Sequence, residues 1–314
     1  MKIVHLKHPY DPKLIEKSRV VLALGFFDGV HLGHRALIEA GRKKADQEGI
    51  QLAVMTFNRH PGLVFSNIYP RDIQYLTTSR QKQEEMEKLG VDLYYEVEFT
   101  SAFGSLEPED FITQYIINLN AEVVVAGYDY TFGPPKETSM ALMEELADSR
   151  FEVITIDEQR LDSGQEISST AIRRYLVEGE IEKANQLLGR PFATTGYVIH
   201  GMARGRQLGY PTANVYPDQD LLIPAIGVYA SRVCVQGQWY DAMTSIGYNV
   251  TFGDSKEYTI EVHILDFDQA IYGENMTIHW YEYMRGEEKF DSIEDLTAQL
   301  AEDEVKTREI LRNY

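Results

Sequence analysis

The first half of the chain alternates short apolar runs with segments of helical periodicity, and this alternation narrows the possible folds more than any other feature. We predict buried strands in five runs: residues 20–27, 52–57, 91–99, 122–128 and 151–156. Amphipathic segments lie between them, at residues 33–48, 79–89, 108–119 and 137–149. Continuous β-branched strands separated by helices are typical of a parallel sheet covered on both faces. We therefore expect a doubly wound α/β domain, with its site at the carboxyl ends of the strands.

The pattern changes after residues 189–191, where Gly, Asp and Asn turns begin to separate short strands. Two short helices, at residues 169–177 and 180–188, are expected to close the first half. The strands predicted beyond them are residues 194–200, 227–235, 238–246, 258–266 and 276–283. So few short strands favour a small antiparallel β-barrel over two large sheets. A C-terminal helix is expected from Ser292, with Asp295 completing its cap, and the domains are predicted as residues 1–186 and 187–314.

Length, charge and cysteine content limit the function classes. A chain of 314 residues is long enough for about two domains. The formal charge of −19 disfavours a general nucleic-acid binder, which normally presents a basic surface. The single cysteine, Cys234, excludes an intrachain disulfide and a cysteine-based zinc site. No run approaches the roughly 20 apolar residues of a membrane helix, and no signal peptide is visible, so we expect a cytoplasmic protein without membrane or nucleic-acid partners.

Residues 25–34 (GFFDGVHLGH) lie where a predicted strand ends and a predicted helix begins. Their glycines allow tight turns and close backbone approach, and a helix N-terminus offers free amides to phosphate. His31 and His34 are three residues apart, so both can face one side of the first helical turn. Two imidazoles there can donate hydrogen bonds to a triphosphate as charge develops. The alternative is a plain strand–turn–helix corner with two surface histidines.

A second helix start, at residues 167–173 (ISSTAIR), supplies hydroxyls and a guanidinium at a positive dipole end. Taken alone, such hydroxyls are usually helix caps. Together with residues 25–34, this segment resembles the paired signature of the nucleotidyltransferase superfamily, an HxGH motif followed by an SSTxIR motif on a Rossmann-like domain. The resemblance implies in-line attack on the α-phosphate of ATP, promoted mainly by positioning and electrostatics.

Two further segments narrow the resemblance. Residues 56–61 (TFNRHP) and 127–133 (GYDYTFG) look, with residues 25–34, like the FMN adenylyltransferase module of prokaryotic FAD synthetases. This resemblance implies transfer of AMP from ATP to FMN, giving FAD and pyrophosphate, with magnesium. His60 and Asp129 would line the cleft for FMN and ATP, although either can instead be an ordinary turn residue. The residues implied in ATP binding, from two sides, are Gly25, Phe27, Asp28, His31 and His34, and opposite them Ser168, Thr170 and Arg173.

The second half opens with residues 200–214 (HGMARGRQLGYPTAN), in which Gly201, Gly205 and Gly209 are spaced four apart, with Arg206 among them. Such a loop can wrap a polyphosphate through backbone amides and charge. It lacks the G-x-x-x-x-G-K-[ST] pattern of a Walker loop. On its own it can equally be an ordinary hairpin connection.

The block GYPTAN, at residues 209–214, closely resembles the signature of riboflavin kinases. The match continues, in family order, through residues 222–230, 260–267, 272–273 and 285–292. Together with the motifs of the first half, the resemblance covers almost the whole chain. It is to the bifunctional bacterial riboflavin kinase/FAD synthetase family.

This resemblance implies a second reaction, phosphoryl transfer from ATP to the 5′-hydroxyl of riboflavin. Thr212 and Asn214 fall where the family holds Mg²⁺ and the ATP phosphates, and hard oxygen ligands suit that ion. Glu261 falls at the catalytic carboxylate, the base for the ribityl hydroxyl. Spacing alone leaves Glu261 as the outward residue of an alternating strand. The loop residues implied in binding the same ATP are Gly201, Gly205, Arg206 and Gly209.

The implied partners are small molecules: ATP, riboflavin, FMN and FAD, with the flavins as substrates and products rather than prosthetic groups. Each half departs from the family pattern. In the first half, Pro134 and Pro135 stand where basic and glycine residues are usual, and Asn58 and Arg59 replace the commoner pair ending in proline before His60. In the second half, Val250 replaces a proline in the segment that follows Tyr248. These departures leave two alternatives: only one activity is live, or the chain is a flavin-binding regulator on the same fold. Self-association is compatible with the sequence, which carries no signal for or against it.

Overall fold

The computed structural model describes residues 1–65, 69, 73–133, 138–201, 205, 208–249 and 257–314. Contacts between residues divide the chain into two compact units, Met1–Ser168 and Ser169–Tyr314. The helices within residues 169–188 therefore group with the second unit. The predicted domain boundary near residue 187 falls at the end of these helices, and it stays a prediction. The departures at residues 134–135 and at Val250 lie outside the described residues, as does Arg206.

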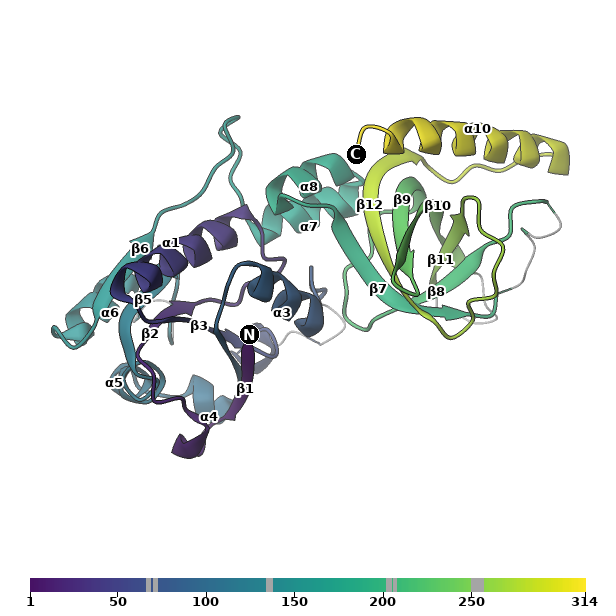
Figure 1. The fold of residues 1–314 in the computed structure, drawn as a ribbon. Coiled ribbons are helices and arrows are strands. Elements are labelled where there is room, and N and C mark those ends of the chain that lie inside the picture. The colour runs from purple at the N-terminus through teal and green to yellow at the C-terminus, as the bar shows by residue number, and fades with distance from the viewer. Residues whose placement is uncertain (66–68, 70–72, 134–137, 202–204, 206–207, 250–256) are drawn as a thin grey trace. The chain divides into compact units, whose positions relative to one another are not determined.

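A six-stranded parallel sheet forms the centre of the first unit (Figure 1). Its strands are β1 (Lys2–Lys7), β2 (Val20–Leu24), β3 (Gln51–Phe57), β4 (Leu93–Glu98), β5 (Ala121–Gly127) and β6 (Glu152–Ile156). Their order across the sheet is β1-β4-β3-β2-β5-β6. The five predicted strands are confirmed. The sequence does not reveal β1, because it lies at the sheet edge and buries only Val4 and Leu6.

Both faces of this sheet are covered, because successive residues of its central strands point to opposite sides. On one face, Val21 and Ala23 pack with α1 (Leu32–Glu48) and α3 (Ser79–Lys88). On the other face, Leu22 and Leu24 pack with α5 (Pro108–Ile112), η3 (Thr113–Ile117) and α6 (Met140–Ala147). The short segments η1 (Pro12–Leu14), α2 (Gly62–Phe65) and α4 (Ser101–Gly104) also belong to this unit. The predicted doubly wound α/β architecture is therefore confirmed.

Two predicted helices differ in their bounds. The segment predicted as one helix over residues 108–119 ends as α-helix at Ile112 and continues as the π-helix η3. Helix α6 begins at Met140 rather than at residue 137, because the hydroxyl of Ser139 caps it by accepting from the N–H of Leu142 at 3.4 Å.

The strand order creates a topological switch point between β2 and β5. From β2 the chain proceeds outward to β3 and β4, and after β4 it crosses to β5 on the other side of β2. In open parallel sheets, ligands bind in the crevice outside the carboxyl ends of the strands at such a point. The segments that leave β2 and β5 at this edge are residues 25–31 and 128–133, which carry two of the predicted motifs.

The second unit is built on a closed antiparallel barrel, with helices packed against it (Figure 1). Its strands are β7 (Phe192–Ile199), β8 (Ala213–Pro217), β9 (Gly227–Val235), β10 (Gln238–Asn249), β11 (Glu257–Ile264) and β12 (Asn275–Arg285). Around the barrel they follow the order β10-β11-β8-β7-β12-β9. The predicted barrel is confirmed. The sequence does not reveal β8, because the strand is short and directly follows the Gly/Arg loop, so no alternation of apolar and polar residues is recognisable.

The helices of the second unit are α7 (Ser169–Glu178), α8 (Ile181–Leu188) and α10 (Ile293–Leu311). Asn185 of α8 donates to the carbonyl of Trp280 at 2.8 Å and accepts from the N–H of Phe192 at 2.7 Å, which ties the helix to β12 and β7. Ser292 caps α10 by accepting from the N–H of Asp295 at 3.0 Å, as predicted. Among the helices of the described residues, none combines the length and the apolar character needed to cross a bilayer.

Candidate active sites

The loop after β2 has a strained backbone. Phe27, Gly29 and Val30 have φ angles of 55°, 82° and 41°, and this left-handed region is costly for the two residues that carry a Cβ. Gly25 tolerates no side chain, since a Cβ there would lie 2.7 Å from the Phe27 ring. Strained conformations persist only where the surrounding structure holds them. The contacts around this loop do so.

Asp28 holds the loop from inside the protein. Its side chain is only 3% exposed and accepts hydrogen bonds from the backbone N–H groups of Leu76 at 3.0 Å and Thr77 at 3.3 Å. The Thr77 hydroxyl in turn accepts from the N–H of Gly29 at 3.1 Å. Because hydrogen bonds to a carboxylate are strong, a segment well downstream in the chain sets the shape of the loop. The ATP contact expected of Asp28 stays a prediction.

His31 and His34 lie together at the start of α1. The Nδ1 atom of His31 accepts from the N–H of His34 at 3.3 Å and so caps the helix. The two rings stack, with centroids 3.6 Å apart and 15° between their planes. Gly33 lies against this pair, because a Cβ there would be 3.2 Å from the His31 ring. The three-residue spacing thus brings both imidazoles to one side of the first helical turn, as the sequence predicts.

The second predicted phosphate motif lies where the chain passes from one unit to the other. Ser168 is the last residue of the first unit, and Thr170 and Arg173 lie on α7 of the second. A Cβ on Gly33 would be 3.5 Å from the carbonyl oxygen of Ile167, the residue before Ser168. The end of the first unit therefore reaches the first turn of α1, beside the histidine pair. That Ser168, Thr170 and Arg173 act together with these histidines stays a prediction.

An aromatic cavity of about 460 Å³ lies in the first unit. Its walls include rings that end or follow successive strands, since Phe57 ends β3, Phe99 follows β4 and Phe132 follows β5. Burial raises the pKa of Tyr130, which also lines it, so its phenol stays neutral at physiological pH. Flat, uncharged walls around a cavity of this size suit a planar aromatic ligand. Further rings of the wall come from Phe65, Phe103 and Phe111.

The residues predicted to contact flavin lie beside this cavity. His60 directly precedes Pro61 and Gly62, which line it, and its Nδ1 accepts from the N–H of Gly62 at 3.0 Å. Asp129 is exposed in the turn after β5, next to Tyr130. The phenylalanines of the wall were missed, because single aromatic residues look like ordinary core positions. For Phe57, Phe99 and Phe132, the place at or just after the carboxyl ends of β3, β4 and β5 was the available signal.

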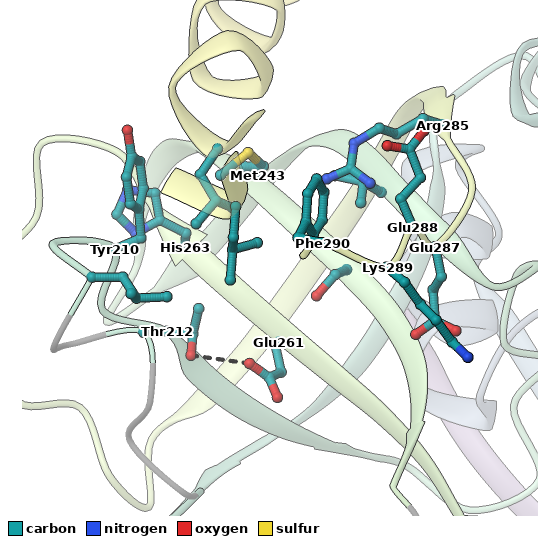
Figure 2. Close-up of a pocket in the computed structure, with 16 residues that line it drawn as sticks. Tyr210, Thr212, Met243, Glu261, His263, Arg285, Glu287, Glu288, Lys289 and Phe290 are labelled. Atoms are coloured by element: carbon teal, nitrogen blue, oxygen red, sulfur yellow. Dashed lines mark hydrogen bonds between the residues drawn. The ribbon is translucent and has the colours of Figure 1, made fainter. Parts of the chain in front are cut away.

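A larger cavity, of about 680 Å³, opens in the barrel (Figure 2). The hydroxyl of Thr212 donates to Oε2 of Glu261 at 3.2 Å, and Figure 2 shows the two side chains pointing toward each other. The rings of Tyr210 and His263 meet edge to face at 5.1 Å on one side of the cavity. The structure therefore brings together Thr212 and Glu261, two of the three residues predicted for phosphoryl transfer.

The other residues predicted for the kinase site lie around β8. Asn214 on β8 pairs directly with Glu261 on β11. A Cβ at Gly201 would be 2.1 Å from the side-chain amide of Asn214, and one at Gly205 would be 2.2 Å from a backbone carbonyl oxygen. Gly209 has a φ of 83°, which favours glycine. Three of the predicted loop glycines are thus required by close approach or by backbone conformation.

A smaller barrel cavity, of about 390 Å³, also borders Thr212. The segment that connects β11 to β12 supplies much of its lining, including Phe267, Ile271 and Tyr272. Thr212 therefore borders both barrel cavities, whereas its hydrogen-bond partner Glu261 lines the larger one. Parts of this segment belong to the riboflavin-kinase-like blocks at residues 260–267 and 272–273, for which the sequence predicts no contact.

Arg285, which the sequence leaves unassigned, links the larger cavity to α10. Its guanidinium forms a bidentate ion pair with Asp303 of α10, with N–O distances of 2.7 and 3.1 Å. The side chains of Arg285 and Asp303 are 16% and 4% exposed. Leu296 and Leu300 of the same helix line the cavity. The ion pair therefore fixes the helix that covers this cavity.

Comparison with known proteins assigns both units. A family model described as FAD synthetase matches residues 14–171, and one described as riboflavin kinase matches residues 188–311. A Listeria monocytogenes protein named bifunctional riboflavin kinase/FMN adenylyltransferase is 49% identical over 308 residues, covering 98% of each chain. The Bacillus subtilis protein of the same name is 40% identical over 306 residues, covering 96% of each chain.

A solved structure gives the same likeness. A Streptococcus pneumoniae protein, described as a macrolide-efflux protein, matches with a TM-score of 0.91 and 38% identity, covering 98% of this chain and 99% of its own. That description differs from the enzyme names of the sequence relatives, although the likeness spans nearly the whole chain. By two family models in sequence order and by identity over nearly its full length, this chain belongs to the bifunctional riboflavin kinase/FMN adenylyltransferase family.

Proposed function

We infer that the chain carries out both reactions of its family. The barrel unit phosphorylates riboflavin with ATP, and the α/β unit transfers AMP from a second ATP to FMN, giving FAD. The observation that carries the kinase assignment is Thr212, which borders both barrel cavities and donates to Glu261. The adenylyltransferase assignment is supported by the aromatic cavity and by the histidine pair, which lie on segments that leave the sheet at its carboxyl edge.

In the barrel, riboflavin occupies the larger cavity and ATP the smaller one. The carboxylate of Glu261 accepts the proton of the ribityl 5′-hydroxyl as its oxygen attacks the γ-phosphorus of ATP. The bond from that phosphorus to the β–γ bridging oxygen breaks, and ADP leaves. The Thr212 hydroxyl orients Glu261 through its 3.2 Å hydrogen bond, so the base is held beside a residue that borders both cavities.

The residues around Thr212 fit a magnesium ion. Thr212 and Asn214 offer hydroxyl and amide oxygens, the hard donors that Mg²⁺ prefers when phosphates and water supply its other ligands. Gly201 leaves space for the Asn214 amide, because any Cβ there would overlap it. When bound, the ion would neutralise charge on the ATP phosphates. Among the described residues no cluster of three His, Cys, Asp or Glu side chains could hold a metal, which suits an ion that arrives with ATP.

In the first unit, an oxygen of the FMN phosphate attacks the α-phosphorus of ATP, and the bond to the β-phosphate bridging oxygen breaks to release pyrophosphate. The attacking phosphate is already ionised, so this step needs no general base. His31 and His34 lie at the positive end of the α1 dipole and donate hydrogen bonds as charge moves onto the leaving pyrophosphate. The flavin ring occupies the aromatic cavity, beside His60 and Asp129.

Separation of flavins by chromatography tests this proposal. The protein is incubated with riboflavin, ATP and Mg²⁺, and we expect FMN to appear first and FAD later. If supplied FMN becomes FAD while riboflavin stays unchanged, only the adenylyltransferase is active and the kinase assignment is wrong. If neither product forms although riboflavin binds, the chain is a flavin-binding regulator and the proposal is wrong.

A further inference from the structure

A buried lysine lies directly behind the loop that leaves β2. The side chain of Lys82, on α3, is among the buried polar groups, with the residue only 5% exposed. Its Nζ donates to the carbonyl oxygen of Phe26 at 2.8 Å and lies 4.4 Å from the centroid of the Phe26 ring. Lysine is rarely buried to this extent, because removing an ammonium from water is costly. Neither of the two proposed reactions uses Lys82.

The Phe26 carbonyl, which accepts from Lys82, lies where β2 turns into the loop that carries His31. Phe26 immediately precedes Phe27, where the backbone enters the left-handed region with a φ of 55°. The hydroxyl of Thr56, on β3, also donates to the Phe26 carbonyl, at 2.9 Å. Two donors from two different elements therefore fix the peptide plane at which the strand turns into the loop that carries His31.

Two acidic groups interact electrostatically with the ammonium of Lys82. Asp28, in the same loop, and Glu96, on β4, both favour the protonated ammonium. Desolvation is the larger effect and lowers the pKa of Lys82 to about 8. Glu85, one turn further along α3, is engaged instead by Arg35 and by Lys88, each at 2.7 Å.

We propose that Lys82 is a positioning residue of the adenylyltransferase site, whose ammonium fixes the Phe26 carbonyl and offsets the buried charge of Asp28 where the ATP phosphates bind. This inference rests on the proposed function of the first unit. A purely structural role would not require charge, since the Thr56 hydroxyl already supplies a neutral donor. An uncompensated carboxylate in a phosphate-binding loop, however, would repel ATP. The charge of Lys82 therefore acts on the ATP phosphates, which this loop is proposed to bind.

The test compares wild type with Lys82→Met, which keeps the length of the side chain and removes both donor and charge. We expect kcat/KM for ATP in FAD formation to fall about 10- to 100-fold, as small misplacements of reacting groups do, while KM for FMN stays unchanged. Wild-type FAD formation should decline as the pH rises through about 8, and the variant should lack this decline. Lys88→Met is the matched control, because Lys88 lies on the same helix with a 70% exposed side chain, and it should behave as wild type.

The outcomes separate this inference from the proposed function. If wild type forms no FAD from FMN and ATP, the proposed function fails. If wild type forms FAD and a folded Lys82→Met matches its kcat/KM for ATP and its pH profile, the positioning role is wrong. Should Lys82→Met fail to fold, Lys82→Gln takes its place, because it keeps a neutral donor at this position and removes only the charge. Loss of kcat/KM for ATP in that variant supports the role, and an unchanged value overturns it.

Discussion

Thr212 and Glu261 face each other across a 3.2 Å hydrogen bond in the wall of the larger cavity, and Thr212 also borders the smaller one. The hydroxyl donates and the carboxylate accepts, so one oxygen of Glu261 is held while the other stays available to a substrate hydroxyl. This arrangement makes the base part of a fixed pair rather than a freely rotating side chain.

Glu261→Gln keeps the shape of this pair and removes the base. We expect kcat for riboflavin phosphorylation to fall by about 10²- to 10⁴-fold, the usual contribution of a general base. Conversion of supplied FMN to FAD should stay as in wild type, because the histidine site lies in the other unit. Flavin chromatography reads both reactions in one sample. Glu309→Gln, an exposed change on α10, is the control, and equal kinase rates in both variants would argue against Glu261 as the base.

The histidine pair gives a second prediction. His31→Ala should reduce FAD formation at least about 100-fold and leave riboflavin phosphorylation within a factor of about two. The same change removes the α1 cap and should cost about 1 kcal/mol of stability. His31→Asn separates the two effects, since Asn is a good cap but not an imidazole. We expect it to restore the stability of the first unit without restoring FAD formation; recovery of activity with Asn would mean that His31 acts only as a cap.

The Arg285–Asp303 ion pair predicts an effect on riboflavin affinity. Asp303→Asn leaves the largely buried guanidinium without its counter-charge, which should cost roughly 3 kcal/mol. Because Leu296 and Leu300 on the same helix line the cavity, KM for riboflavin should rise while FAD formation from FMN stays constant. Thermal unfolding and kinase assays measure the two effects. Asp266→Asn is the control, since its pair with Arg308 is on the surface, with 75% of the Asp266 side chain exposed, and surface pairs contribute little.

The buried ammonium of Lys82 gives the first unit a pH-dependent stability of defined sign. Burial lowers the pKa of Lys82 from 10.5 to about 8, so the folded protein releases this proton at a lower pH than the unfolded chain does. Between these two values the unfolded chain binds more protons, and the free energy of unfolding therefore rises with pH. Urea unfolding should show that the stability of wild type relative to Lys82→Met increases from pH 7 to pH 10. A difference that does not change with pH would mean that Lys82 titrates normally.

Removal of magnesium should stop both transfer reactions but leave riboflavin binding intact. With excess chelator, we expect both FMN and FAD formation to stop, because phosphoryl and nucleotidyl transfer need the phosphate charge neutralised. Riboflavin binding to the barrel, followed by flavin fluorescence, should persist, since the larger cavity is lined by protein side chains. Loss of riboflavin binding on chelation would place the ion in the flavin cavity instead.

Local patterns made much of this molecule predictable. The apolar runs of the central strands, the Ser292 cap and the spacing of His31 and His34 all depend on residues close together in the chain, and the structure agrees with them. Gly25 and Gly201 were readable as motif members, although the close approach of the Phe27 ring to Gly25 and of the Asn214 side chain to Gly201 was not.

What the sequence could not supply are contacts between distant segments. Lys82 and Phe26 are 56 residues apart, and nothing in the local sequence around Lys82 distinguishes it from an exposed helical lysine. The cavity that Thr212 shares with Phe267 likewise depends on how β8 and β11 pair. Strands β1 and β8 were missed because the first buries too few residues and the second is too short to show a period.

The Asp28 carboxylate, bonded to the amides of Leu76 and Thr77, has a consequence for engineering. Attempts to alter nucleotide choice in the first unit would naturally randomise residues 25–34, yet the conformation of that stretch is dictated by residues 76–82. A library that varies only residues 25–34 leaves residues 76–82 unchanged, so it samples different side chains on one fixed backbone. A library that varies residues 76–82 instead would change the backbone conformation of residues 25–34 without changing their sequence.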